Sequence, residues 1–338
     1  MVKIALIGAG FIAQTHANAY KQIKNTEIFT VVDKIEEMGR RLAQNCNAKY
    51  FMDIDEILKN NNIDLVDICV PTFLHEEMVL KAAAAKKHIF CEKPLALSLE
   101  EADNMIKAVK DNGVKAMVGH TLRFWPEYVK VKEYLDSGIL GKPLQVFCQR
   151  LAVTPDWHQG NWGASEKFGG GAALDLHIHD LDYLIWIFGK PSIIMAQGIF
   201  DPVAKEAGGL VHIATTIEFK NKVLALTEGG WEFKGAFPFT MALRILCENG
   251  TIEWIFRAGK NIEERAQNAE IKVYKNDSSV EILEADKTDA FFLELSYLVD
   301  CIENDKPINN ATFEDGRASL ELALAAIKSA KDHCVVKL

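Results

Sequence analysis

The chain has 338 residues, 49% hydrophobic and 25% charged, with a formal net charge of −9 at pH 7. This composition is typical of a globular protein, and the length exceeds what a single core usually supports, so two domains are expected. The acidic charge argues against nucleic acid or an anionic membrane as the main partner, because either requires a basic face.

The sequence carries no signal for a membrane or an oxidising compartment. No apolar run approaches the ~18 residues of a membrane span, and the first three residues lead straight into a strand pattern. The seven cysteines are scattered, odd in number and without C-x-x-C spacing, which favours reduced, packed thiols. A cytoplasmic protein that acts on a small molecule is predicted.

The first element is an apolar strand pattern over residues 2–7 that ends in the turn Gly8-Ala9-Gly10, and a helical pattern follows. Strand, glycine turn and helix match the dinucleotide-binding fingerprint. In it, the first glycine permits the tight turn and the second lets the backbone approach a pyrophosphate. The third, small position is Ala13, which lets the helix pack closely on the strand. The helix start would then face the phosphates.

The second strand pattern, residues 27–32, ends in Asp33. This carboxylate lies roughly 20 residues beyond the helix start, where it would accept hydrogen bonds from the adenosine ribose hydroxyls. Asp33 therefore favours NAD. Lys34, Arg40 and Arg41 leave NADP as an alternative, and the aspartate is also of a type that caps a following helix.

Strand and helix patterns continue to alternate. Helices are predicted near residues 55–60, over 76–85 and over 98–111, the last with Ser98 and Glu101 as a capping box, and strands over 63–70, 88–91 and 115–119. Alternation of this kind predicts a doubly wound parallel sheet whose ligand lies at the carboxyl ends of the strands. The residues at those ends are Gly8, Asp33, Pro71, Thr72, Glu92, Lys93 and His120.

From residue 144 the pattern changes to short alternating segments with hairpin-like joins, among them residues 220–222 and 248–250. Such a series predicts a mostly antiparallel sheet. Two helices are expected near residues 290–303 and 314–332. The fold class is therefore α/β, with a dinucleotide-binding domain over 1–121 and an α+β substrate-binding and oligomerisation domain over 122–338.

A polar and aromatic loop pattern covers residues 155–162 and includes Trp162. Tryptophan stacks on the C–H faces of a polyhydroxylated ring, and asparagine binds its hydroxyls, so the loop would suit a sugar or polyol. A surface loop pinned by its tryptophans is an equal alternative. Arg123, His120 and Tyr183 are further candidates for the pocket, each with a packing or ion-pair role as the alternative.

Four segments together resemble the glucose–fructose oxidoreductase/inositol dehydrogenase/rhizopine-catabolism (Gfo/Idh/MocA) family. They are Pro71-Thr72-Phe73-Leu74-His75, Cys91-Glu92-Lys93-Pro94, Arg123-Phe124-Trp125-Pro126 and the glycine-rich run over residues 169–182. The resemblance covers nearly the whole chain. It implies a Rossmann domain followed by an α+β domain with a large, mostly antiparallel sheet, one face of which often pairs subunits into homodimers or homotetramers.

The resemblance also implies site residues. Lys93 matches the active-site lysine, with a cis bond to Pro94, and Asp175 and His179 match the carboxylate and histidine of the family. The sequence departs from the family at His177, where glycine is common, which makes His177 a candidate for substrate contact. The positions that match the cofactor lining are Gly8, Phe11, Ile12, Asp33, Thr72, His75 and Glu92. Gly10 of the glycine turn and Pro71 at a strand end are further cofactor-binding candidates.

Asp175, His177 and His179 also suggest a zinc site, because His-x-His can bind zinc from a strand. If the run begins a helix, however, His177 and His179 point about 200° apart while Asp175 and His179 share a face. That is the arrangement of an oriented general base. No metal is predicted.

The expected chemistry is hydride transfer between NAD(P) and a secondary alcohol or ketone of an inositol, sugar or related polyol. His179 would remove the hydroxyl proton, Asp175 would orient the imidazole, and Lys93 would polarise the reacting oxygen. Two alternatives are an NAD-dependent glycosidase with no net redox turnover and a non-catalytic nucleotide-binding regulator. The retention of all three residues argues against the regulator.

Overall fold

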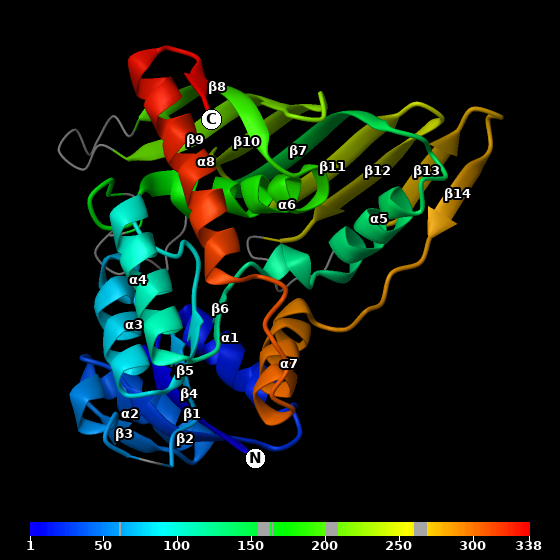
Figure 1. The fold of residues 1–338 in the computed structure, drawn as a ribbon. Coiled ribbons are helices and arrows are strands. Elements are labelled where there is room, and N and C mark those ends of the chain that lie inside the picture. Colours follow the sequence, from blue (N-terminus) through cyan, green and yellow to red (C-terminus); the bar gives the residue numbers. More distant parts are fainter. Residues whose placement is uncertain (61, 155–162, 164, 201–208, 260–268) are drawn as a thin grey trace. The chain divides into compact units, whose positions relative to one another are not determined.

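The computed structural model describes residues 1–60, 62–154, 163, 165–200, 209–259 and 269–338 (Figure 1). The chain divides into two compact units. The first unit contains Met1–Phe124 and Thr288–Arg317, and the second contains Trp125–Lys287 and Ala318–Leu338. Among the described residues, no helix combines the length and the apolar character needed to cross a bilayer.

The first unit is built on a six-stranded parallel sheet in the order β3-β2-β1-β4-β5-β6. The central strands are apolar except at Lys3 and Asp67, because helices cover both of their faces. This sheet confirms the predicted Rossmann architecture. The strands are β1 (Val2–Ile7), β2 (Thr26–Val32), β3 (Lys49–Phe51), β4 (Leu65–Ile68), β5 (His88–Cys91) and β6 (Ala116–Val118).

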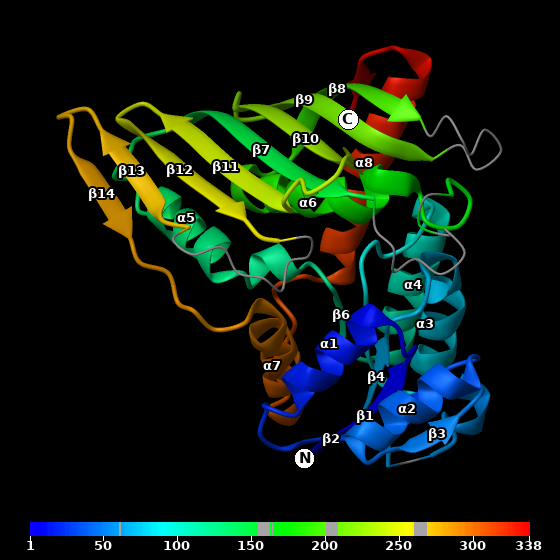
Figure 2. The ribbon, with the colours of Figure 1, turned by 180° about the vertical axis from the view of Figure 1, so that it is seen from behind.

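Helices α3 (His75–Ala84) and α4 (Leu99–Asn112) pack against each other on one face of this sheet. On the other face, α1 (Phe11–Tyr20) packs against α7 (Ala290–Glu303), a late segment of the chain (Figures 1 and 2). Helix α2 (Glu36–Cys46) links β2 to β3.

Of two helices that the sequence predicts in this unit, one forms with its predicted cap and the other is a single short turn. Ser98 and Glu101 form the predicted capping box at the start of α4. The helix predicted near residues 55–60 is instead a single 3₁₀ turn, η1 (Ile54–Glu56), capped by Asp53. One turn satisfies the backbone there and leaves no apolar face long enough for a full helix to bury.

The second unit is built on a nine-stranded sheet in the order β14-β13-β12-β11-β7-β10-β9-β8-β15. Neighbouring strands are antiparallel except β7 and β10, which run parallel. The predicted α+β class is confirmed. The strands are β7 (Pro143–Val153), β8 (Pro191–Phe200), β9 (Leu210–Phe219), β10 (Leu224–Phe233), β11 (Thr240–Cys247), β12 (Gly250–Arg257), β13 (Ile271–Lys275), β14 (Val280–Leu283) and β15 (Val336–Lys337).

Helices α5 (Pro126–Asp136) and α6 (Ile178–Phe188) lie on one face of this sheet (Figures 1 and 2). Tyr183 of α6 donates a hydrogen bond from its hydroxyl to the carbonyl of Tyr128 on α5, at 3.1 Å. Near the end of the long helix α8 (Phe313–Asp332), the Ser329 hydroxyl accepts a hydrogen bond from the Ala196 N–H of β8. These contacts place the core of the second unit between its helices and one face of its sheet.

Candidate active site

The glycine turn after β1 has the geometry that dinucleotide binding requires. Gly8 has φ +103°, and a Cβ there would lie 2.5 Å from the carbonyl oxygen of Cys69, so only glycine lets the turn pass the end of β4. Gly10 precedes α1, and a Cβ there would meet open space. The helix behind the turn is held close because Ala13 is fully buried. The open side of Gly10 fits a pyrophosphate against the first N–H groups of α1.

Asp33, directly after β2, faces this turn. Its Oδ2 accepts a hydrogen bond from the Ala9 N–H at 2.7 Å, and its Oδ1 accepts one from the Ile35 N–H at 2.7 Å. Each carboxylate oxygen has a second lone pair, so Asp33 retains acceptor sites for ribose hydroxyls. The glycine turn and the carboxylate together fit a bound NAD.

The Lys93 turn follows β5, and its bond to Pro94 is cis, as predicted. Two side chains hold the backbone of this turn. The Lys93 N–H donates to Glu92 Oε2 at 3.1 Å, and the buried ring of His75 places Nδ1 3.0 Å from the Pro94 carbonyl oxygen. The other ring nitrogen of His75 lies 3.0 Å from the Val70 carbonyl oxygen, which ties the turn to the end of β4.

Of three further predicted residues of the first unit, Thr72 and Arg123 are buried and Pro71 is half-buried. Pro71 precedes the short helix η2 (Thr72–Leu74), in which Thr72 is buried at the carboxyl end of β4. Arg123 ends the short helix η3 (Thr121–Arg123), and its Nη1 forms an ion pair with Asp315 at 3.1 Å. The predicted contact of Arg123 with substrate stays a prediction.

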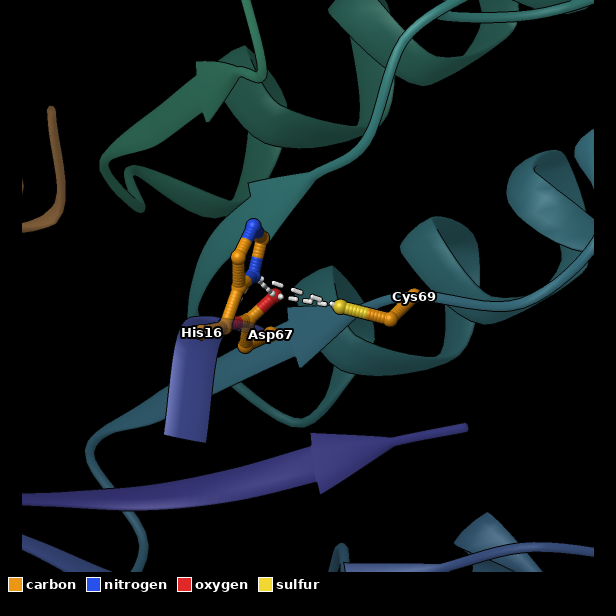
Figure 3. Close-up of side chains that lie close together, drawn as sticks. All are labelled: His16, Asp67 and Cys69. Carbon is orange, nitrogen blue, oxygen red and sulfur yellow. Dashed lines mark hydrogen bonds and ion pairs between the residues drawn. The ribbon is translucent and has the colours of Figure 1, made fainter. Parts of the chain in front are cut away.

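A buried polar cluster that sequence reasoning missed lies beneath these strand ends. His16 of α1 places Nδ1 3.0 Å from Asp67 Oδ2, and the Cys69 thiol lies 3.4 Å from the same nitrogen and donates to Asp67 Oδ1 at 3.3 Å (Figure 3). On the far side of the ring, His16 Nε2 lies 3.2 Å from Glu92 Oε1. The cluster thus continues into the residue that holds the Lys93 amide.

The protonation states in the cluster follow from burial and charge. Burial alone would lower the pKa of His16, but the Asp67 carboxylate and Cys69 raise it well above its ordinary value. Burial, reinforced by Glu92, raises the pKa of Glu294 on α7, whose Oε2 accepts a hydrogen bond from the Thr121 hydroxyl. These directions favour the protonated form of the His16 ring and of the Glu294 carboxyl.

His16, Asp67 and Cys69 are also the one group of three clustered metal-ligand side chains in the part of the chain that the structure describes. Burial raises the pKa of the Cys69 thiol, with Asp67 acting in the same direction. A protonated thiol is a poor metal ligand, and hydrogen bonds among the three groups account for their spacing. The geometry therefore favours a hydrogen-bonded cluster.

In the second unit, Asp175 and His179 lie on consecutive helical turns. Asp175 belongs to the π-helical turn η5 (Ala173–His177), and His179 to the first turn of α6. Both side chains are partly exposed, whereas His177 between them is fully buried. The run approaches β9 closely, because a Cβ on Gly171 would lie 2.4 Å from the Leu210 carbonyl oxygen. The predicted helix start is thus a π turn, a form common at functional sites.

His177 is turned toward the sheet. Its Nε2 lies 2.9 Å from the Thr227 hydroxyl and 3.3 Å from the Thr215 hydroxyl, and these two hydroxyls are 2.6 Å apart. Gly229 gives the ring its space, since a Cβ there would lie 2.8 Å from Nδ1. Burial, with smaller contributions from His212 and Arg150, lowers the pKa of His177 to about 3. Its contact with substrate stays a prediction, and Trp162 lies outside the described residues.

Two family patterns match the chain. The pattern "Oxidoreductase family, NAD-binding Rossmann fold" matches residues 2–120, and "Oxidoreductase family, C-terminal alpha/beta domain" matches residues 132–338. The chain belongs to the Gfo/Idh/MocA oxidoreductase family. The strand order and glycine turn of the first unit, and the large mixed sheet of the second, agree with these two descriptions.

Two relatives that match along the full length are inositol dehydrogenases by name. The myo-inositol 2-dehydrogenase of Thermotoga maritima is 27% identical over 100% of this chain and 98% of its own, and the scyllo-inositol 2-dehydrogenase (NAD(+)) of Bacillus subtilis is 30% identical over 100% and 96%. The 2,7-anhydro-N-acetylneuraminate hydratase of Escherichia coli is 29% identical over 69% and 63%. A solved levoglucosan dehydrogenase, in complex with NADH and levoglucosan, shares the fold at TM-score 0.82 and 21% identity, over 100% of this chain and 99% of that one.

Proposed function

We propose that this oxidoreductase transfers a hydride between NAD(P) and a secondary alcohol or ketone of an inositol, sugar or related polyol. The observation that carries the proposal is the position of Lys93. It follows β5 in the same parallel sheet whose β1 and β2 end in the glycine turn and Asp33. Two relatives that match over the full length are inositol dehydrogenases by name, which supports a cyclic polyol.

The residues divide the reaction between them. Bound NAD(P) supplies the hydride acceptor for alcohol oxidation. We assign to His179 the removal of the hydroxyl proton, because a neutral imidazole is a base near physiological pH. Asp175 orients that imidazole or binds a neighbouring hydroxyl. Lys93 carries a positive charge to the reacting oxygen and stabilises the negative charge that develops there.

Asp33 supports NAD as the preferred cofactor. A carboxylate at this position binds the ribose hydroxyls, and it repels the 2′-phosphate of NADP. Lys34 forms an ion pair with Asp53 at 3.3 Å, and Arg40 one with Glu36 at 2.7 Å. These pairings engage two of the three nearby cations that would otherwise favour a 2′-phosphate.

Chemistry without net redox change is the second candidate function. The hydratase among the relatives favours it, because hydration by definition leaves the overall oxidation level unchanged. An NAD-dependent glycosidase likewise catalyses a reaction with no net redox change. The two candidates differ in one observable: a dehydrogenase accumulates free NADH in proportion to polyol oxidised, and the alternative does not.

We propose that the protein forms a homodimer or homotetramer through the sheet of the second unit. Side chains alternate along each strand, and the set opposite the helix-covered core includes exposed large apolar residues. An apolar surface of this kind on a sheet is typical of an interface between subunits. The exposed residues are Met195, Ile199, Leu224, Leu226, Leu246, Ile255 and Tyr274.

The test is a panel of inositols, sugar alcohols and aldoses with NAD and with NADP, and of their keto forms with NADH, followed at the nicotinamide absorbance. The expected result is stoichiometric NADH from at least one polyol. Cleavage of a nitrophenyl glycoside with catalytic NAD, and no NADH from any polyol, would replace this proposal by the second candidate.

A further inference from the structure

The buried cluster around His16 connects helix α1 to the Lys93 turn. The ring stands between two carboxylates, with Nδ1 3.0 Å from Asp67 Oδ2 and Nε2 3.2 Å from Glu92 Oε1. The other oxygen of Glu92 accepts the N–H of Lys93 at 3.1 Å. A continuous chain of polar contacts therefore runs from Asp67 through His16 and Glu92 to the lysine backbone.

The Glu92 carboxylate packs directly against Gly119. A Cβ on Gly119 would lie 2.8 Å from Glu92 Oε1, so the glycine makes the space that the carboxylate fills. The ring of His16 is held edge-on to Phe90, with centroids 5.2 Å apart, and packs at 6.0 Å from Phe291 of α7. Both aromatic rings restrict the rotation of the imidazole.

Such a cluster contributes little net stability to the fold. His16 and Asp67 are fully buried and Glu92 nearly so, and burying charged groups carries a desolvation penalty that pairing seldom repays in full. Apolar side chains of similar size would serve packing as well. Clusters of this kind are found preferentially at functional sites, where they fix a reacting group.

We propose that His16 is a positioning residue for Lys93, acting through Glu92. The inference deepens the proposed function and rests on it. Asp67 holds the ring by a hydrogen bond at Nδ1, the ring attracts the Glu92 carboxylate through the 3.2 Å ion pair at Nε2, and Glu92 accepts a hydrogen bond from the Lys93 amide. The position of the lysine then depends on which side chain occupies position 16. A displacement of about 1 Å at a reacting group is enough to slow a reaction ~100-fold.

Two substitutions of His16 separate its contact with Asp67 from its contact with Glu92. Asparagine places its amide nitrogen near the position of Nδ1 and so keeps the Asp67 contact but loses Glu92. Glutamine places its nitrogen near Nε2 and so keeps the Glu92 contact. We expect His16→Asn to lower kcat ~10–100-fold with the Kd for NAD changed less than about 3-fold, and His16→Gln to retain most of kcat.

The matched control is His88→Asn. His88 begins β5, the strand whose other end leads to Glu92, and its Nδ1 accepts the Lys115 N–H at 3.1 Å. This variant should leave kcat unchanged. If His16 acts through Glu92, adding Glu92→Gln to His16→Asn should cause little further loss, because the two substitutions break the same contact. Loss of kcat in both His16 variants in proportion to their loss in Tm would overturn the proposal and indicate a purely structural cluster.

A second measurement on the full chain needs no substrate. In protein labelled with ¹⁵N-histidine, Glu92→Gln should shift the Nε2 resonance of His16, and His88→Asn should leave it in place. An unchanged resonance in Glu92→Gln would rule out the link between His16 and Glu92. If wild-type protein oxidises no polyol, the proposed function fails, and the resonance still decides whether the link exists.

Discussion

The Asp33 carboxylate reaches across from the end of β2 and accepts the N–H of Ala9 in the glycine turn at 2.7 Å. One side chain thereby joins the two parts of the expected dinucleotide site. Asp33→Ala should weaken the binding of NAD ~10–100-fold, because charge-assisted hydrogen bonds to the ribose are lost. The binding of NADP should weaken less. Titration of both cofactors by calorimetry measures the difference.

The control for that experiment is Asp33→Asn, which keeps an acceptor for Ala9 while removing the charge. Loss of the hydrogen bond from Ala9 alone would weaken the binding of NAD and of NADP by the same factor. Equal weakening of NAD and NADP in Asp33→Ala would therefore remove the ribose role from Asp33.

Lys93→Ala should reduce kcat by several orders of magnitude while NAD binding changes little. In the proposed mechanism the lost group is a positive charge at the reacting oxygen, and its contribution is made in the transition state. Steady-state kinetics with the best polyol, beside a direct NAD titration, provides the measurement. Lys107→Ala is the matched control, since Lys107 pairs with Asp111 on the exposed surface of α4. Undiminished turnover in Lys93→Ala would contradict the central assignment.

Leu226→Glu should shift the assembly toward smaller species. Leu226 is exposed on β10 near the middle of the sheet, and a charge there would be desolvated in any interface that covers this face. Sedimentation velocity over a concentration series should show wild type as a dimer or tetramer and the variant dissociating at least ~10-fold more readily. Ile139→Glu adds the same charge outside the strands, at a side chain 60% exposed, and should assemble like wild type. A monomeric wild type would contradict the proposed interface.

His177 makes stability depend on pH. Burial lowers its pKa to about 3 in the folded chain, whereas in the unfolded chain it has its ordinary value near 6.5. Between these values only the unfolded state takes up the proton, so stability falls as pH falls, by up to about 1.4 kcal/mol per unit. His177→Gln, which places an amide near the Thr227 hydroxyl, should flatten this dependence in urea unfolding measured from pH 7 to 4.

The exposed His333 provides the comparison for that measurement. It has φ +51°, which asparagine adopts readily, so His333→Asn should unfold with the same pH dependence as wild type. A slope in His177→Gln that equals the wild-type slope would mean that other groups cause the acid sensitivity.

Local patterns predicted most of the elements. The strand before Gly8, the capping box at Ser98 and the hairpin joins of the second sheet depend on residues close in sequence, and the structure contains each of them. The parallel pairing of β7 with β10 and the π turn at residues 173–177 depend on contacts between distant segments. Periodicity alone does not reveal such contacts.

The polar cluster was missed for the same reason. His16, Asp67 and Glu294 come from α1, β4 and α7, and Glu92 follows β5, so the four residues are far apart in the sequence. One signal was available: Asp67 interrupts a strand of a parallel sheet that is buried on both faces. A charge in such a strand requires a partner, so it indicates a cluster even where the other members cannot be named.

Helix α7 has a consequence for how the protein is made. It completes the first unit by packing on α1, but it begins only at Ala290. During synthesis, the nucleotide-binding sheet leaves the ribosome long before that helix. The face of α1 that α7 later covers therefore stays exposed to solvent, or bound to a chaperone, until nearly the whole chain has been synthesised. A gene fragment that ends at residue 121 would produce a protein with that face permanently uncovered.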